Sequence, residues 1–365
     1  LPLFIRELGI ASTAEERIWS GWAFAGPFLL SFISTPIWGS LGDKYGRKLM
    51  TVRAIFGLGI SQILVGLSQT PFQLVLFRMI QGVVSGFIPA ALSLVASNTP
   101  KEKSGYALGV LQTSTAAGSI MGPMIGATLS AFFGFRIIFF INAAICIVIG
   151  FFIIYGFKEI TTNDDNGKNY TIFDNLSFIK QRKHLFLAVI IIFLAQMSIM
   201  TNQPIFTLYI ETMISDPKYL ATISGIIFSI TGVANVISGP IWGKRNDKYG
   251  SSKNLSIALF IGSFSILLHA FVNNLHYVGL LRILLGISIG GILPSLYTLM
   301  SNETPIERRG GVLGISSSFT TLGNMIGPLT GGYIASYFGF QMVFFFGASI
   351  LLICGSIVLK GFIDR

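Results

Sequence analysis

The sequence predicts an all-α membrane protein built from two six-helix bundles that are related as parallel repeats. The 365 residues are 52% hydrophobic and only 11% charged, whereas soluble domains carry about 25% charged residues. Apolar runs such as residues 72–96 and 255–272 contain at most one charged side chain, and roughly 18 such residues cross a bilayer as a helix. The stretch PIWGSLGDKYGRK at 36–48 returns as PIWGKRNDKYGSSK at 240–253. A repeat joined to apolar segments indicates a duplicated membrane bundle.

Apolar runs of this kind predict eleven transmembrane helices. We place them at about residues 18–41, 49–68, 72–96, 105–131, 137–157, 185–210, 219–242, 255–272, 277–300, 310–335 and 341–359. Eleven is an odd number for a duplicated bundle. Residues 3–5 align with residues 208–210, and that second copy follows an apolar run that begins at Leu185. We therefore expect an equivalent helix before Leu1, so that this chain lacks most of a first helix and the full protein has twelve, six in each half.

The repeat also sets the expected domain boundaries. We predict an N-terminal bundle at 1–157 (helices 2–6 of a twelve-helix fold), a polar linker at 158–184 and a C-terminal bundle at 185–365 (helices 7–12). With the motif loops on one side of the membrane, that side carries 18 Lys and Arg residues and the other side carries four. The positive-inside rule therefore places the motif loops and the linker in the cytoplasm.

Charge and cysteine usage exclude several classes of protein. The net charge of +10 lies in short loops between spans, which points to membrane orientation and not to nucleic-acid binding. Cys146 and Cys354 lie inside apolar runs without metal-ligand spacing, so we expect packed cysteines, no disulfide and no metal site. The sequence has no phosphate-binding loop, no HExxH motif and no intramembrane pair of carboxylates, so we expect neither an enzyme nor an ATP-driven pump, and no cofactor.

Two motifs carry a resemblance to a known family. The first loop reads Gly39-x-Leu41-Gly42-Asp43-x-x-Gly46-Arg47-Lys48, and the later motif reads Gly118-x-x-x-Gly122-Pro123-x-x-Gly126. With the two halves, the first motif resembles the major facilitator superfamily, and the second resembles its antiporter signature. The likeness covers essentially the whole chain and is greatest to bacterial drug:proton antiporters of the multidrug-efflux kind. It implies the major facilitator fold in a bacterial cytoplasmic (inner) membrane.

The first motif is expected to form a gate on the cytoplasmic side. Its residues are Gly39, Asp43, Gly46, Arg47 and Lys48, and its second copy holds Gly243, Asp247 and Gly250. In the family, such an aspartate interacts with a helix N-terminus in the other half, where free N–H groups favour an anion. The resemblance thus pairs Asp43 with the helix start at 310–311 and Asp247 with the helix start at Gly105. The second copy lacks the Arg-Lys pair, so we expect Asp43 to form the principal gate. The alternative for each loop is a solvated turn.

Two arginines lie at equivalent positions in apolar helices. Arg78 and Arg282 each cost several kcal/mol in a membrane unless they are paired or hydrated, and such residues are functional by default. The segment around Arg78 and Gln81 resembles a family motif that is implicated in proton transfer, which makes Arg78, Gln81 and Asp43 the proton-coupling candidates. Because arginine scarcely deprotonates, we expect it to tune a carboxylate or to hold water. The alternative is that each arginine extends toward the membrane surface.

Glycines that recur every four residues mark the second motif. They lie along one helix face, and a proline within the run allows bending. The set comprises Gly118, Gly122, Pro123 and Gly126, repeated as Gly323, Gly327, Pro328 and Gly331. The resemblance implies a bendable helix that suits antiport, and the alternative is generic close packing.

The sequence shows no proton-carrying carboxylate near the middle of any complete span. The carboxylate could lie in the absent first helix, Asp43 with Arg78 could contribute, or coupling could be non-protonic. Polar side chains that could line a cavity are Gln112, Thr113, Gln196, Asn202, Gln203, Asn235 and Arg282. Interhelical hydrogen bonding is the alternative role for the amides.

These features together predict a secondary active transporter. We expect a monomeric, multi-pass exporter of small amphiphilic drugs or toxic molecules, working in the lipid bilayer by proton-coupled antiport and alternating access, and thus a contributor to antibiotic resistance. The alternative is a carrier of the same superfamily for one defined metabolite or siderophore. A channel or receptor is disfavoured because the gate motif is present twice.

Overall fold

The computed structural model is helical throughout the residues that it describes. These are residues 1–10, 12–87, 90–91, 94–95, 101–156, 172–214, 216 and 219–362. Within them, the side chains of 36, 39–40, 42–44, 101–110, 112–113, 306–307, 310 and 362 are not described. No strand occurs in this part of the chain. The all-helical prediction is therefore confirmed.

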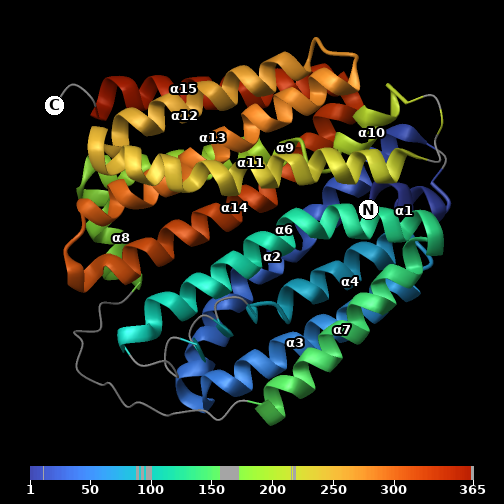
Figure 1. The fold of residues 1–365 in the computed structure, drawn as a ribbon, viewed down its shortest axis with the longest axis horizontal. Coiled ribbons are helices and arrows are strands. Elements are labelled where there is room, and N and C mark those ends of the chain that lie inside the picture. The colour runs from blue at the N-terminus through green and yellow to red at the C-terminus, as the bar shows by residue number, and fades with distance from the viewer. Residues whose placement is uncertain are drawn as a thin grey trace.

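The helices fall on the predicted spans, but the predicted spans 72–96 and 185–210 are broken at 84–86 and at 202–205. The first half holds α1 (Pro2–Glu7), α2 (Thr13–Tyr45), α3 (Arg47–Leu67), α4 (Pro71–Val83), α6 (Lys101–Phe133) and α7 (Phe135–Gly156). The second half holds α8 (Ile172–Gln181), α9 (Lys183–Thr201), α10 (Phe206–Glu211), α11 (Leu220–Tyr249), α12 (Ser251–His269), α13 (Leu275–Asn302), α14 (Ile306–Phe338) and α15 (Phe340–Phe362). Figure 1 shows the two groups as separate bundles.

Eight segments within the described residues are long and apolar enough to cross a membrane. The predicted spans at 18–41, 72–96 and 310–335 fall on α2, α4 and α14, which are not among the eight. Helix α4 ends at Val83 after 13 residues, and Gly86 has a φ of 104°, so the predicted span 72–96 is interrupted at 84–86. Helices α2 and α14 are rich in Gly, Ser and Thr, because these two helices pack against each other between the bundles.

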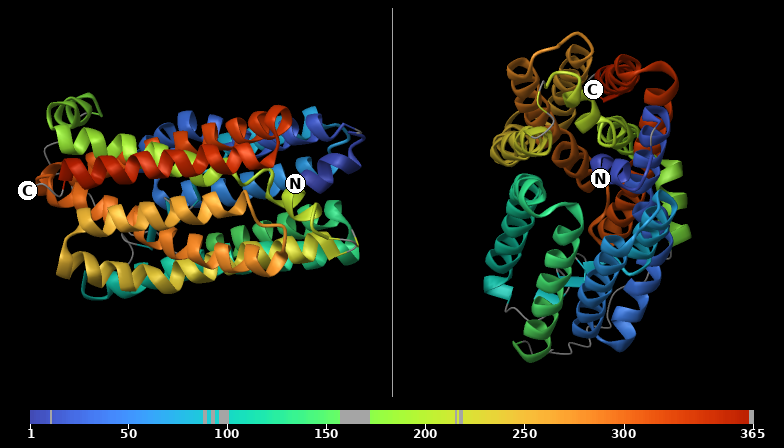
Figure 2. Two further views of the ribbon diagram at one scale, coloured as in Figure 1. Left: turned by 90° about the horizontal axis from the view of Figure 1, so that it is seen from above. Right: turned by 90° about the vertical axis from the view of Figure 1, so that its right-hand side faces the viewer.

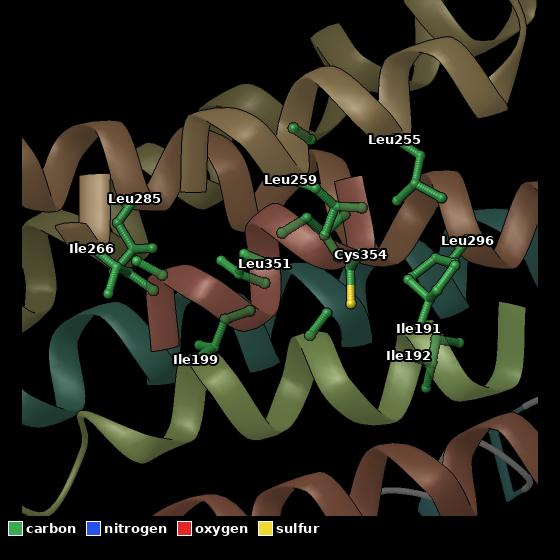
Figure 3. Packing of buried hydrophobic residues seen from close by; sticks show 14 of the residues in the cluster. Ile191, Ile192, Ile199, Leu255, Leu259, Ile266, Leu285, Leu296, Leu351 and Cys354 are labelled. Carbon is green, nitrogen blue, oxygen red and sulfur yellow. The ribbon is translucent and has the colours of Figure 1, made fainter. Parts of the chain in front are cut away.

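Each half has its own hydrophobic core. The larger cluster is built mainly from α9, α11, α12, α13 and α15. Figure 3 shows its packing, with Ile199, Leu259, Leu285 and Leu351 directed toward one another and the free thiol of Cys354 buried among them. A smaller cluster around Phe4, from α1 to α4, fills the first half, with residues of α7 packed against it. The domain boundaries at 157 and 185 stay a prediction, which these two cores support.

The duplication extends to individual hydrogen bonds. The Trp38 indole N–H donates to the Val83 carbonyl at 2.6 Å, and the Trp242 indole N–H donates to the Ile287 carbonyl at 2.8 Å. Each pair ties α2 or α11 to the helix that follows two positions later in its half. Both tryptophans belong to the repeated PIWG stretch. The repeat therefore specifies the same interhelical contact twice.

Helix α8 is a feature that the sequence analysis did not anticipate, since it lies inside the predicted polar linker. Its ten residues form a helix that packs against α9 and α14. Ile179 and Asn175 are buried in this contact, while Phe173 and Leu176 are exposed. One turn of apolar spacing within a short polar stretch is too weak a pattern to distinguish a helix from a linker.

Two pairs of helices make the main contacts between the bundles. Helix α2 of the first half packs against α14, and α6 packs against α11 of the second half. Figure 2 shows the two bundles nearly end-on, with α14 lying at their junction. The small helices α1 and α10 lie at one end of the molecule, which we call the α1–α10 end. The opposite end, where α2 and α11 finish at Tyr45 and Tyr249, is called the motif end.

Candidate functional site

The two contacts between the halves are related by the repeat. A Cβ atom at Gly21 of α2 would lie 2.7 Å from the Pro328 carbonyl oxygen of α14, and one at Gly225 of α11 would lie 2.6 Å from the Pro123 carbonyl oxygen of α6. Only glycine permits so close an approach of two helix backbones. The prolines of the predicted antiporter motif therefore face the opposite half of the molecule.

The glycines of that motif have different surroundings in the two copies. Gly323, Gly327 and Gly331 of α14 lie directly against the backbone of α9, where an added Cβ would clash. Added Cβ atoms at Gly118, Gly122 and Gly126 of α6 would meet nothing within 4 Å. In the described part of the first half, no helix takes the position that α9 takes in the second. The second copy is thus a packing surface, and the role of both copies in antiport stays a prediction.

The structure describes only part of the gate motif. Gly46 and Gly250 have φ values of 100° and 84°, a conformation that favours glycine and lets the helix before each residue turn sharply into the next. The Lys48 ammonium donates to the Ile154 carbonyl at 2.7 Å, which fastens α3 to α7. The Arg47 carbonyl accepts a hydrogen bond from the Thr51 hydroxyl. The contacts of Gly39 and of the Asp43 side chain are not described, so the main gate contact remains a prediction.

The second copy of the motif makes few contacts among the described residues. Asp247 is exposed and makes no hydrogen bond or ion pair with any described residue. An added Cβ at Gly243 would meet nothing within 4 Å. At the position expected to receive Asp43, Gly311 lies against the Asn175 side chain of α8. Helix α8 therefore covers this turn of α14, a contact that the sequence analysis missed.

Arg78 is hydrogen-bonded to the neighbouring helix α2. Its Nε atom donates to the Ala23 carbonyl of α2 at 3.0 Å, and its Nη1 atom donates to Gln81 Oε1 at 3.1 Å. These bonds direct the guanidinium across the bundle and not along the helix toward the membrane surface. Among the described residues, no carboxylate pairs with Arg78.

Arg282 occupies the equivalent position in different surroundings. It is 4% exposed, and its guanidinium lies 3.3 Å from the ring centre of Phe206 and 5.3 Å from that of Phe228. Its Nε atom has no hydrogen-bond partner within the described chain. Leu285 stands where the first half has Gln81, so two aromatic faces replace the amide as its neighbours.

The polar cavity candidates divide into two groups. Gln196 donates to Asn324 Oδ1 at 2.7 Å and Asn202 donates to the Ser198 carbonyl at 3.3 Å, so both make contacts within the second half. Gln203 lines a cavity of about 290 Å³ between the halves, together with Phe24 and Phe228. Asn235 faces Gly290 within the second half. Gln112 and Thr113 lie outside the described side chains.

The most strongly charged contact between the halves was missed by the sequence analysis. At the α1–α10 end, Arg6 of α1 makes two bonds to Glu211 of α10, at 2.6 Å and 2.8 Å. Arg6 also contacts Glu16 of α2 through Oε2, at 3.0 Å and 3.3 Å. Arg6 and Glu211 are 205 positions apart and are equivalent in the repeat. Opposite charges at equivalent positions were therefore the signal that could have identified this pair.

A second group strengthens the same end of the molecule. Arg17 of α2 donates to the Ala335 carbonyl of α14 at 2.6 Å and lies 4.3 Å from the Phe340 ring centre. The Trp22 indole N–H lies 3.3 Å from the Tyr333 hydroxyl, also between α2 and α14. The α2–α14 contact is therefore closed at this end by polar bonds as well as by close packing.

Comparison with known proteins decides the family. A family model described as Major Facilitator Superfamily matches residues 1–218 and 185–365. The chain belongs to the major facilitator superfamily. The multidrug resistance protein MdtG of Proteus mirabilis is 37% identical over 96% of this chain and 87% of its own length. MdtG of Yersinia enterocolitica is 38% identical over 96% of this chain and 85% of its own length, and MdtG of Escherichia coli strain K12 is 35% identical over 96% and 86%.

Solved structures agree on the fold of this superfamily member. A bacterial homologue of the human lysosomal transporter Spinster, crystallised in an inward-facing and occupied conformation, superposes with a TM-score of 0.81 at 13% identity, over 100% of this chain and 92% of that one. The nucleoside transporter NupG superposes with a TM-score of 0.79 at 14% identity, over 94% and 90%. The predicted major facilitator fold is confirmed, and the chain is a transport protein of the membrane and not an enzyme.

Proposed function

We propose that this protein exports amphiphilic drugs and other toxic small molecules across a bacterial cytoplasmic membrane in exchange for protons. The observation that carries the proposal is the similarity, over nearly the whole chain, to relatives named multidrug resistance proteins. The described residues that line the cavity between the halves fit such substrates. They include Phe24, Phe135, Phe139 and Phe228 and no charged side chain. Aromatic surface favours amphiphiles over strongly charged metabolites.

Alternating access follows from the two related contacts between the halves. We propose that residues 1–157 and 185–365 move as units around the α2–α14 and α6–α11 contacts, with the segment 158–184 joining them as a cytoplasmic linker. Gly21 and Gly225 let the backbones approach closely there. The transporter in this proposal is a monomer, and the motif end faces the cytoplasm because the basic loops lie there.

The gate residues and the arginines keep the roles expected from the resemblance. Asp43 closes the motif end in the outward-facing state, with Asp247 as its weaker counterpart. Replacement Asp43→Asn is expected to leave the protein in the membrane and to abolish export, whereas Asp247→Asn reduces it less. Immunodetection of membrane fractions combined with dye efflux from cells measures both effects. Near-normal export by Asp43→Asn would remove the gating role.

Reconstitution tests the proposed function directly. Purified protein in proteoliposomes is loaded with a panel of unrelated cationic dyes, a siderophore and a sugar phosphate, with and without an imposed pH gradient. We expect several dyes to move, faster with the gradient than without it. Movement of one metabolite or siderophore alone would favour the narrower carrier, and transport that ignores the gradient would contradict proton coupling.

A further inference from the structure

The ion-paired cluster of Arg6, Glu16 and Glu211 has a geometry that distinguishes its two carboxyl groups. Arg6 contacts both Glu211 oxygens at 2.6 Å and 2.8 Å, the short, two-pronged arrangement of an ionic pair. Its contacts to Glu16 are longer, at 3.0 Å and 3.3 Å, and both reach the same oxygen, Oε2. Arg6 is therefore fully engaged as a cation by Glu211 and only partly by Glu16.

Burial separates the two carboxyl groups further. Glu16 is 2% exposed, and its Oε1 atom has no hydrogen-bond partner among the described residues. The side chain of Glu211 is 32% exposed. A buried carboxylate oxygen without a donor is costly when it is charged, and a proton on that atom removes the cost. The free Oε1 atom is the position at which such a proton fits, while Oε2 continues to accept from Arg6.

We propose that Glu16 is the carboxyl that binds the coupling proton at the α1–α10 end, and that this end closes on the protonated form. Closure then joins the halves through the ionic pair of Arg6 and Glu211, while the neutral acid of Glu16 lies buried beside it. The proposal rests on the proposed proton antiport, since it names the residue through which the proton acts. When the two halves separate, Glu16 loses its cover and exchanges its proton with the outside.

A cavity gives access to Glu16, and Glu211 is the other carboxyl group beside it. A cavity of about 200 Å³ is lined by Glu16, Arg6, Arg17, Glu211 and Phe340 among others, and a water takes up about 30 Å³ in the liquid. The charged groups that act on Glu16 are Arg6 from α1, Glu211 from α10 and Arg17 from its own helix. Helix α15 presents the Phe340 ring, and α14 presents the Ala335 carbonyl to Arg17.

The direction of the pH dependence follows from burial. Glu16 lies in the first turn of α2, ahead of the apolar stretch that begins at Ile18. Desolvation raises the pKa of its carboxyl above the usual range, and the hydrogen bond from Arg6 offsets part of this effect. In the open state the carboxyl is hydrated and its pKa returns toward that of an exposed glutamate. The state with the higher pKa gains stability as the pH falls, so acid favours closure of the α1–α10 end.

The test measures the width of the α1–α10 end without drug and without a gradient. Thr13→Cys and Thr212→Cys place spin labels on opposite halves at exposed positions beside the cluster, in a protein that also carries Cys146→Ala and Cys354→Ala. Distances are recorded by double electron–electron resonance in nanodiscs between pH 8 and pH 5. We expect the short-distance population to grow as the pH falls.

Three variants give the proposal its controls. Glu16→Gln, a mimic of the neutral acid, is expected to hold the short distance at every pH, and Glu211→Gln to favour the long distance at every pH. Glu15→Gln changes the exposed neighbour in the same turn and is expected to behave as the parent. A wild-type pH response in Glu16→Gln, or no response in the parent, would overturn the proposal.

An infrared measurement on the parent protein tests the protonation of Glu16 even if a variant folds poorly. The carboxylic-acid C=O band of the parent is expected to titrate with the distance change, and this component is absent in Glu16→Gln. Persistence of the same titrating band in Glu16→Gln would assign the proton elsewhere. Neither measurement involves transport. Efflux that does not depend on pH, together with an intact distance response, would therefore refute proton antiport and leave the role of Glu16 in closure standing.

Discussion

The two contacts between the halves have the same backbone arrangement and different side chains. At the α2–α14 contact, Gly21 lies against the Pro328 carbonyl, and Arg17 adds a bond to the opposite half. At the α6–α11 contact, Gly225 lies against the Pro123 carbonyl, and the added bond is uncharged, from the Ser229 hydroxyl to the Ile120 carbonyl at 2.5 Å.

This difference separates two tasks that a rocking transporter must perform. The close glycine contacts are steric, present twice and independent of pH, so they suit a pivot. Among the described residues, arginine contacts between the halves accompany the α2–α14 contact only, at the same end as the Arg6–Glu211 pair. A charged contact can be made and broken at modest cost near water, because solvent replaces its partners. Under the proposed alternating access, duplication accounts for the pivot, and divergence of the halves accounts for the closure.

The largest effect is expected from filling the pivot. Gly21→Ala and Gly225→Ala each force a methyl group against a backbone carbonyl, and overpacking of this kind costs about 1–3 kcal/mol. We expect each variant to lose about tenfold or more in efflux rate while still reaching the membrane. Gly239→Ala on α11, where an added Cβ meets nothing within 4 Å, serves as the matched control. Equal activity of the Gly21 and Gly239 variants would contradict the pivot.

An intermediate effect on stability is expected to differ between the two equivalent arginines, Arg78 and Arg282. Arg78→Leu leaves the Ala23 carbonyl and the Gln81 amide oxygen without their donor, which costs about 1–3 kcal/mol when the groups are buried. Arg282→Leu breaks no hydrogen bond with a described residue and removes a buried cation. We expect a lower melting temperature for Arg78→Leu than for Arg282→Leu, measured by intrinsic fluorescence in detergent. The reverse order would show that Arg282 has a stabilising partner.

The smallest change in stability is expected from replacing the two repeated tryptophans. Trp38→Phe and Trp242→Phe each remove one indole donor from a carbonyl, a loss of about 1 kcal/mol. The Arg53 guanidinium lies 3.5 Å from the Trp38 ring centre, whereas that of Arg245 lies 5.6 Å from the Trp242 ring centre. We therefore expect Trp38→Phe to lower the melting temperature slightly more. Indistinguishable melting temperatures would show that the closer arginine adds nothing.

The fold was accessible from the sequence because its signals are long and repeated. Each apolar run is long enough to be identified alone, and the PIWG stretches fix the register between the halves. Helix α8 escaped prediction because its buried face amounts to Asn175 and Ile179 within a polar stretch. Burial there depends on α9 and α14, which no local pattern reveals.

The candidate site was less accessible because its parts meet only in three dimensions. Glu16 precedes its apolar span by two residues and resembles an ordinary acidic first turn. Its burial results from Arg6 and from helices that are distant in the sequence. No sequence pattern indicated a role for Arg17, because its partner is the backbone carbonyl of Ala335. The repeat is the one sequence feature that links Arg6 with Glu211, because it places opposite charges at equivalent positions.

One experiment tests most directly whether the halves move as units around the two glycine contacts. Spin-label pairs at Thr13 and Thr212 report the α1–α10 end, and pairs at the exposed Tyr45 and Tyr249 report the motif end. Both distances are measured by double electron–electron resonance in nanodiscs across the same pH series. The account predicts opposite changes, with one end shortening as the other lengthens. Distances that lengthen together, or a motif end that stays constant while the other end moves, would contradict it.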